Sequence, residues 1–141
     1  MPKTTVPKEA SGLLAEGWTY LDVRSIPELD QGHPTGAVNV PLLHMENGRM
    51  TPNPEFQRVI EATFAKDAKV VVGCKAGGRS LQAATLMEAA GYTNVVDMRG
   101  GYHGERDNFG RASVPGWAQE GLPIEMACPP EKAYEWLAKK K

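Results

Sequence analysis

The stretch with the clearest chemical potential is residues 74–79, Cys-Lys-Ala-Gly-Gly-Arg. Its two glycines let the backbone curl so that several N–H groups point inward. Lys75 and Arg79 add positive charge, and a helix beginning here would direct its positive end at the same place. All three effects favour a thiolate over a thiol at Cys74. A thiolate at the mouth of a loop is a nucleophile, so Cys74 is the candidate catalytic residue.

The elements on either side would hold that cysteine in place. Lys69–Gly73 contains three consecutive valines, which predicts a buried strand. Ser80–Ala90 predicts a helix, because its apolar residues recur at helical spacing. That predicted apolar stripe consists of Ala83, Leu86, Met87 and Ala90. A strand, a glycine-bearing loop and a helix start together form an anion cradle.

The rest of the chain alternates predicted strands and helices. Further strands are expected at Trp18–Val23, Ala37–Val40 and Asn94–Met98, and Thr4–Val6 could add a short one. Helices are expected at Pro7–Gly17, at Ser25–Gly32 with a Ser25/Glu28 capping box, and from Asn53-Pro54, where Phe56, Val59, Ile60 and Phe64 form the apolar stripe. Alternation of this kind predicts an α/β fold with a mostly parallel sheet and helices on both faces.

Three polar residues follow predicted strand ends. Asp22, Cys74 and Arg99 should therefore share the rim where ligands bind in such sheets. His44–Met50 reads as a polar loop, and Gly32–Gly36 as a turn cluster with His33 in a structural role.

Several motifs, in order, resemble those of the rhodanese-like family. They are Leu21-Asp-Val-Arg24, Gly32-His-Pro-Thr-Gly-Ala-Val-Asn-Val-Pro41, the loop Cys74–Ser80, Gly100-Gly-Tyr102 and Gly121-Leu-Pro123. The likeness is strongest to single-domain, plant-type thiosulfate sulfurtransferases and covers roughly residues 5–125. It implies a three-layer domain with a sheet of about five strands. We expect this domain at 5–126, followed by a C-terminal helical extension at 127–141.

The resemblance also implies a reaction and roles for single residues. The family cysteine takes a sulfane sulfur from a donor, becomes a persulfide and passes the sulfur to an acceptor. Here Cys74 would be the sulfur carrier, and Asp22 and Arg24 would be scaffolding. The substrate-binding loop would consist of Lys75, Ala76, Gly77, Gly78 and Arg79. Its amides would hold the outer sulfur, Lys75 would steer anions, and Arg79 would brace the loop and attract an anionic donor.

One segment departs from the family pattern. The family has a tryptophan shortly after its double glycine, whereas here Trp117 follows an apparent insertion at 103–116. That insertion would leave the same rim as Cys74. It is either a solvated, tolerated insertion, which we favour, or a lid or docking loop for the acceptor.

The composition argues against several other classes of protein. With 16 basic and 17 acidic residues in 141, the chain has no nucleic-acid character, and no apolar run approaches the roughly 18 residues of a membrane span. No metal site or cofactor is expected, because the three histidines lack ligand spacing. Cys128 lies outside the cradle and is expected to be inert. The N-terminus lacks a secretory signal, which predicts a cytoplasmic location.

Two alternative functions stay open. A phosphatase or arsenate reductase would resemble Cys-x5-Arg, whereas Cys74 and Arg79 enclose only four residues, a loop better suited to a single sulfur atom. A sulfur-relay or regulatory module would dock a partner and turn over little by itself. For the enzyme, the expected partners are a small anionic sulfur donor and a thiol or cyanide acceptor.

Overall fold

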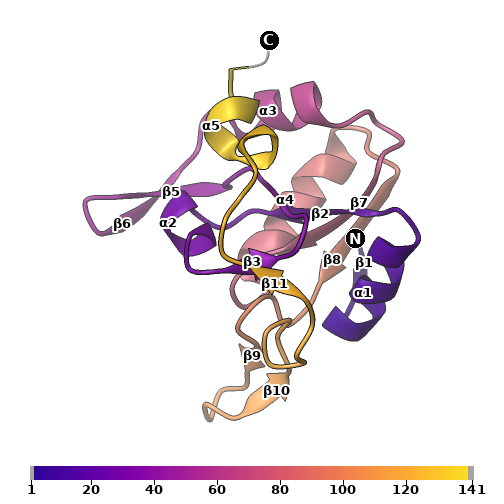
Figure 1. Ribbon diagram of the computed structural model, residues 1–141, viewed down its shortest axis with the longest axis vertical. Coiled ribbons are helices and arrows are strands. Elements are labelled where there is room, and N and C mark those ends of the chain that lie inside the picture. Colours follow the sequence, from indigo (N-terminus) through magenta and orange to yellow (C-terminus); the bar gives the residue numbers. More distant parts are fainter. Residues whose placement is uncertain (1, 140–141) are drawn as a thin grey trace.

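The computed structural model describes residues 2–139 and is built on a five-stranded parallel sheet. The strand order is β1 (Lys3–Thr5), β8 (Asn94–Met98), β7 (Lys69–Gly73), β2 (Thr19–Asp22) and β4 (Val38–Asn39). Every neighbouring pair in this sheet runs parallel. The predicted α/β class and the strands expected near these positions are confirmed. Strand β7, which ends directly before Cys74, lies at the centre of the sheet, where both of its faces are covered (Figure 1).

Alternate residues of the strands enter two hydrophobic clusters, one on each face. Leu21, Val70 and Val72 pack with α3 (Phe56–Thr63) and α4 (Gly78–Ala89) on one side. Tyr20 and Val71 pack with α1 (Pro7–Ala15) on the other. Val70, Val71 and Val72 are fully buried, which explains why β7 lacks polar alternation. Helices therefore cover both faces, as expected.

The helix that follows the Cys74 loop, α4, begins earlier than its apolar pattern predicts. Helix α4 starts at Gly78, so Arg79 and Ser80 lie in its first turn. Its buried face consists of Ser80, Ala83, Ala84 and Met87. Leu86, expected in the core, is 44% exposed. The buried face of α4 is therefore rotated about the helix axis relative to the predicted apolar stripe, and it includes the polar residue Ser80.

Helix α3 begins later than predicted. It runs Phe56–Thr63 with Glu55 as N-cap, whereas Asn53-Pro54 was expected to open it. The side-chain oxygen of Asn53 accepts a hydrogen bond from the Glu55 N–H at 3.0 Å, and its amide donates to the Pro41 carbonyl at 2.8 Å. Asn53 thus closes the turn before the helix and ties that turn to the end of the β4 segment.

Two segments expected as loop and turn form short antiparallel ladders. His44–Met50 belongs to a hairpin of β5 (Leu43–Glu46) and β6 (Arg49–Pro52), closed by Asn47 and Gly48 at φ of 51° and 76°. Asn-Gly is the preferred pair for such a turn, a signal that the sequence contained. Within the turn cluster, β3 (His33–Pro34) pairs with β11 (Ile124–Glu125).

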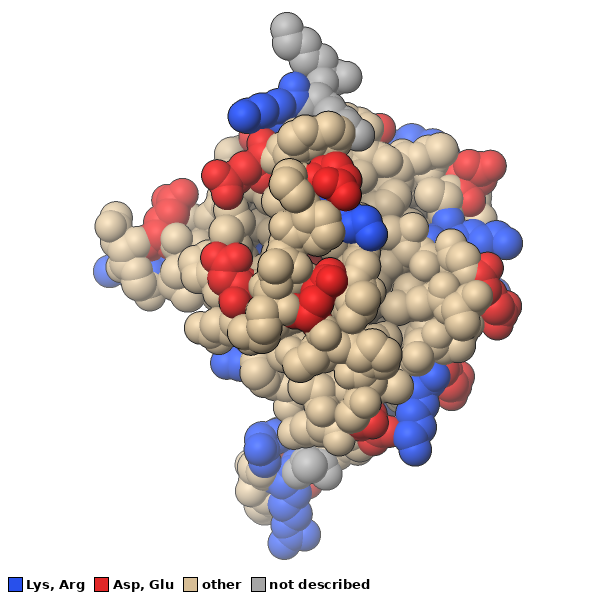
Figure 2. All heavy atoms as spheres, viewed as in Figure 1, with Lys and Arg blue, Asp and Glu red and all other residues tan. Residues whose placement is uncertain are grey.

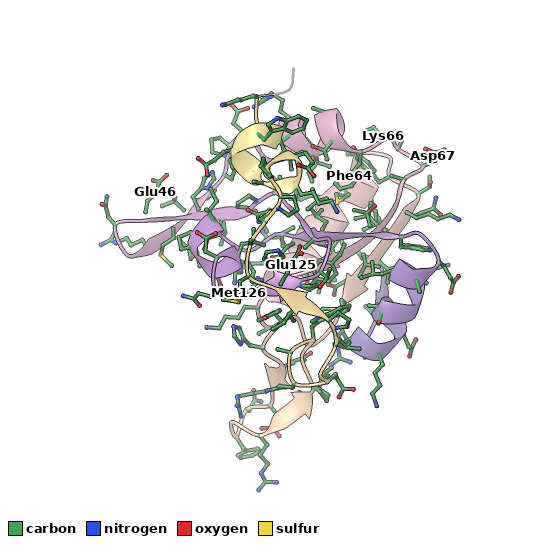
Figure 3. The ribbon with its side chains drawn as sticks, in the orientation of Figure 1. Glu46, Phe64, Lys66, Asp67, Glu125 and Met126 are labelled. Atoms are coloured by element: carbon green, nitrogen blue, oxygen red, sulfur yellow. The ribbon has the colours of Figure 1, made fainter. Side chains whose placement is uncertain are left out.

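The buried His33 has the structural role predicted for it. Its ring Nδ1 lies 3.1 Å from the Leu29 carbonyl and its Nε2 lies 3.2 Å from Glu125 Oε1. Glu125 lies on β11, where that strand crosses in front of β3 (Figure 3), and it also accepts the Gly36 N–H. The imidazole therefore joins α2 (Ile26–Leu29) to the C-terminal part of the chain.

The C-terminal segment returns to the main core. A 3-10 turn (Pro130–Lys132) precedes α5 (Tyr134–Leu137), and Leu137 is 2% exposed within the cluster formed by α3 and α4. Figure 1 shows α5 beside α3, at the end of the molecule opposite the hairpin of β9 (Glu105–Arg106) and β10 (Ala112–Val114). Residues 140–141 of the extension predicted at 127–141 lie outside the described residues. The domain boundary at 126 stays a prediction.

Candidate functional site

Cys74 lies in the short connection between β7 and α4. Gly77, the N-cap of α4, has φ of 114°, a conformation that glycine adopts without strain. This conformation directs its N–H at the sulfur, and the distance from Gly77 N to Cys74 Sγ is 3.0 Å. Of the inward amides expected from residues 75–79, Gly77 supplies this hydrogen bond. The cysteine is 1% exposed, so its sulfur lies beneath the loop rather than above it.

Glycines on either side allow the close approaches that the loop requires. A Cβ on Gly73 would lie 1.8 Å from the Tyr20 hydroxyl, and a Cβ on Gly101 would lie 2.4 Å from the Cys74 carbonyl. The turn containing Gly101 supports the loop directly, because Tyr102 N donates to the Cys74 carbonyl at 2.7 Å and His103 N donates to the Lys75 carbonyl at 2.9 Å. The double-glycine motif therefore allows the following turn to approach and hydrogen-bond to the Cys74 loop.

Arg79 braces the loop through a bidentate ion pair. Its two terminal nitrogens donate to Glu28 at 2.7 and 2.9 Å. Glu28 also completes the predicted capping box with Ser25. Burial alone would raise the pKa of Glu28, but hydrogen bonds from Arg79 and Ser25 lower it to about 2. Arg79 is therefore committed to a carboxylate of its own chain.

Asp22 and Arg24 form the buried scaffold expected of them. Arg24 donates to both carboxylate oxygens of Asp22 and to the Gly32 carbonyl, and its guanidinium lies 4.5 Å from the centre of the Tyr102 ring. Arg24 does not form an ion pair with the Glu28 carboxylate. The guanidinium of Arg24 instead reaches the Glu28 backbone carbonyl at 3.4 Å, because the Glu28 carboxylate is occupied by Arg79.

A pair of buried polar side chains, Ser80 and Asp97, lies behind the cysteine, and neither was among the site residues predicted from the sequence. Ser80 Oγ is 3.5 Å from Cys74 Sγ and 2.5 Å from Asp97 Oδ1. Ser80 and Asp97 are 0% and 2% exposed. The sequence predicts Asp97 only as one residue of the strand Asn94–Met98. The available signal was a charged residue within Val-Val-Asp-Met, where a buried strand would otherwise be apolar.

Segments from both sides of the loop surround a recess of about 770 Å³. It is lined by Gln31, Lys75, Ala76, His103, Gly104, Arg106 and Gln119. The predicted loop residues Lys75 and Ala76 thus meet the start of the insertion. Burial lowers the pKa of His103, and the positive charges of Arg24 and Lys75 lower it further. The recess has cationic side chains and no carboxylate in its lining, which favours an anion.

The insertion folds into a projecting hairpin. Strands β9 (Glu105–Arg106) and β10 (Ala112–Val114) pair antiparallel, and the chain then returns to the buried Trp117. Figure 2 shows basic side chains gathered at the end of the molecule where this hairpin projects. Arg99, the third predicted rim residue, follows β8 and pairs with Glu105 of the hairpin at 3.1 Å. The insertion therefore starts at the same edge of the sheet as the Cys74 loop, as expected.

The second cysteine does not extend the site. Cys74 and Cys128 are both free thiols. Burial raises the pKa of Cys128, and Glu125 raises it further, which disfavours a reactive thiolate. Among residues 2–139, no cluster of three or more His, Cys, Asp or Glu side chains is placed to hold a metal ion. Within the same range, no helix is both long and apolar enough to cross a membrane.

This fold and loop define a rhodanese-like domain. The family model for the rhodanese-like domain matches residues 6–106, and the chain belongs to that family. It is 37% identical over 125 residues to thiosulfate sulfurtransferase 16, chloroplastic, of Arabidopsis thaliana, covering 89% of this chain and 94% of that protein. It is 36% identical over 104 residues to the human thiosulfate:glutathione sulfurtransferase, covering 72% and 90%.

A solved structure shares the fold. The crystal structure of Rv0390 from M. tuberculosis superposes with a TM-score of 0.73 at 25% identity, over 89% of this chain and 98% of that one. The chain spans 61% of the length of two further plant relatives. The cytoplasmic location expected from the N-terminus is contradicted by the plant relatives, because two of those that match well are named as chloroplastic.

Proposed function

We propose that this protein is a sulfurtransferase that carries a sulfane sulfur on Cys74 as a persulfide. The observation that supports it most is the hydrogen bond from the Gly77 amide to Cys74 Sγ, at the positive end of a 12-residue helix. An amide fixed on this sulfur stabilises negative charge there in both the thiolate and the persulfide. The names of the relatives, thiosulfate sulfurtransferase and thiosulfate:glutathione sulfurtransferase, support the same assignment.

The reaction takes place in two displacements. The Cys74 thiolate attacks the outer sulfur of thiosulfate, forming an S–S bond while the S–S bond of the donor breaks and sulfite leaves with its electron pair. An acceptor thiolate or cyanide then attacks the outer sulfur of the persulfide and releases Cys74. Lys75 and the cationic recess would attract the anionic donor, and Arg79 would hold the loop through Glu28.

A phosphatase is disfavoured by the same geometry. In a phosphate-binding loop the arginine must be available to the oxyanion, whereas both terminal nitrogens of Arg79 bind Glu28. We expect clear sulfur transfer from thiosulfate and no turnover of an aryl phosphate. The opposite result would refute the proposal.

The decisive experiment is intact-mass analysis after thiosulfate treatment. Wild type and Cys128→Ser should each gain the mass of one sulfur atom, and Cys74→Ser should gain none. A gain that depends on Cys128 instead would overturn the assignment of the carrier. Loading of Cys74 without turnover to cyanide or a thiol would favour the sulfur-relay alternative, in which the acceptor is a protein partner.

A further inference from the structure

Cys74, Ser80 and Asp97 form a continuous chain of polar atoms beneath the loop. The Cys74 Sγ to Ser80 Oγ distance is 3.5 Å, and the Ser80 Oγ to Asp97 Oδ1 distance is 2.5 Å. All three residues are at most 2% exposed. Asp97 is fixed by the sheet, because β8 pairs in register with β7 and places Asp97 opposite Val72, two residues before the cysteine. These atoms are therefore shielded from bulk water and lie within hydrogen-bonding reach of one another.

The surroundings favour different charge states at the two ends. Burial raises the pKa of Asp97, although the Ser80 hydroxyl and the charge of Arg99 act in the opposite direction. Among the described residues, no cationic side chain forms an ion pair with Asp97, so its carboxylate is costly to keep ionised. At the other end, the Gly77 N–H is already directed at the sulfur. Negative charge is thus better accommodated on Cys74 than its burial alone would allow.

We propose that Asp97 accepts the Cys74 thiol proton through Ser80, and that this pair positions and stores the proton during sulfur transfer. As Cys74 Sγ attacks the donor's outer sulfur and forms the new S–S bond, the thiol proton passes to Ser80 Oγ while the Ser80 proton passes to Asp97 Oδ1, and sulfite departs with the electrons of the broken bond. The products are a persulfide on Cys74 and a neutral carboxylic acid at Asp97. When the acceptor later releases the Cys74 thiolate, the proton can return from Asp97 by the same route.

The Ser80 hydroxyl is placed to work in both directions. Its proton lies within reach of two acceptors, Asp97 Oδ1 at 2.5 Å and the Gly77 carbonyl at 3.0 Å. When Asp97 is ionised, Ser80 donates to it and receives the thiol proton. When Asp97 is protonated, it donates to Ser80, which can then donate to the thiolate. Ser80 therefore satisfies its partners before and after the transfer.

Other charges near the pair set the background for any pH dependence. They are Tyr20, Asp22 and Arg24 from β2 and its end, Glu28 from α2, Lys75 and Arg79 from the loop and α4, Arg99 after β8, and His103 and Glu105 from the insertion. All of them are retained in the variants below. Differences between variants therefore report the Ser80–Asp97 connection.

The test measures attack by Cys74 on an electrophile without any sulfur donor, so it is independent of the proposed function that its transfer steps assume. In a Cys128→Ser background, the rate of alkylation by iodoacetamide is followed against pH. Asp97→Asn retains the shape of the side chain but cannot take a proton. Because the relay removes the thiol proton as the sulfur attacks, we expect the alkylation rate of this variant to fall about ten- to hundredfold at neutral pH. The rate should recover at high pH, where the thiolate forms without the relay, so the midpoint of the rate profile rises. Ser80→Ala should reproduce this shift.

Two matched variants separate the relay from a merely structural role. Ser80→Thr keeps the hydroxyl and should restore the midpoint, whereas Thr85→Ala removes a hydroxyl from the same helix far from the sulfur and should leave the midpoint unchanged. A loss of equal size at every pH, or an unchanged midpoint in a folded Asp97→Asn protein, would overturn the proposal. If Asp97→Asn does not fold, the Ser80→Ala and Ser80→Thr comparison gives the same decision.

Discussion

At the scale of single residues, the site depends on Gly73 because a side chain at this position would collide with Tyr20. The Tyr20 hydroxyl is buried without a hydrogen-bond partner and occupies the space of a Cβ at Gly73. The enzymes with the longer Cys-x5-Arg loop often carry a histidine at the position before their cysteine. Here a histidine would displace Tyr20 and its neighbour Trp117, whose ring centre lies 5.8 Å from that of Tyr20.

This conflict predicts a specific mutational pattern. Gly73→Ala should lower the free energy of unfolding by about 1–3 kcal/mol through overpacking against Tyr20, measured by urea denaturation. Tyr20→Phe, which removes the clashing hydroxyl, should recover part of that loss in the double variant. Gly12→Ala, in open space within α1, serves as the control and should be neutral or stabilising. Additive losses in the Gly73/Tyr20 double variant would contradict the explanation.

The Glu28–Arg79 pair predicts an acid-sensitive loop. Glu28 has its pKa lowered from 4.5 to about 2, so its ion pair contributes fully to stability above pH 4.5. That contribution is lost as the pH falls through about 2. Glu28→Gln should therefore lose stability at neutral pH, by about 1–2 kcal/mol, and show a smaller further loss on acidification than wild type. Thermal melts between pH 7 and pH 2 measure both; parallel curves would refute the pair's role.

At the scale of elements, the inserted hairpin contributes directly to the recess beside the loop. His103, Gly104 and Arg106 line it together with Lys75 and Ala76. From the sequence we preferred a solvated, tolerated insertion. The contact with the recess instead favours a role in docking the acceptor. The hairpin's position is supported from below by the hydrogen bonds of Tyr102 and His103 to the active loop.

The recess predicts selectivity for charged acceptors. Arg106→Gln should raise the Michaelis constant for a carboxylate-bearing thiol, such as 3-mercaptopropionate, by about three- to tenfold, because one cation of the recess is lost. The constant for the neutral 2-mercaptoethanol should stay unchanged. Arg111→Gln, on the same hairpin but outside the recess lining, is the matched control. Deletion of 104–115 with unchanged constants for both thiols would remove the docking role altogether.

The sequence predicted elements more successfully than contacts. The three valines of β7 and the Ser25/Glu28 capping box are local signals, and both were confirmed. The β5–β6 hairpin was missed although Asn47-Gly48 marks it. The partner of Arg79 lies 51 residues away on another element, and nothing in the local sequence identifies it. Asp97 stands out locally as a charged residue in a buried strand, but its contact with Ser80 depends on the register between strands, which the sequence does not give.

At the scale of the whole molecule, the C-terminal segment is joined to the main core through Leu137. Glu125 connects the strand before that segment to His33 and Gly36. Helix α5 therefore packs on the same layer that contains α3 and α4. The domain boundary at residue 126 stays a prediction, which truncation would test.

This arrangement predicts that the extension stabilises the domain. Leu137→Ala should lower the free energy of unfolding by about 2–4 kcal/mol, because it leaves a cavity in the core. Phe109→Ala, at a side chain that is 85% exposed, should have little effect. Urea denaturation of both variants, with a chain ending at 126, provides the measurement. A truncated protein as stable as the full chain would show that the extension is only attached.

The backbone hydrogen bonds from the Gly101 turn to Cys74 and Lys75 also bear on protein engineering. Transplanting only the six residues from Cys74 to Arg79 into another scaffold would transfer the reactive sulfur. It would not transfer the turn whose N–H groups hydrogen-bond to the loop. The smallest portable unit includes the continuous segment of β7, the loop and the beginning of α4, together with the turn after β8, which the chain keeps apart and the fold brings against the loop.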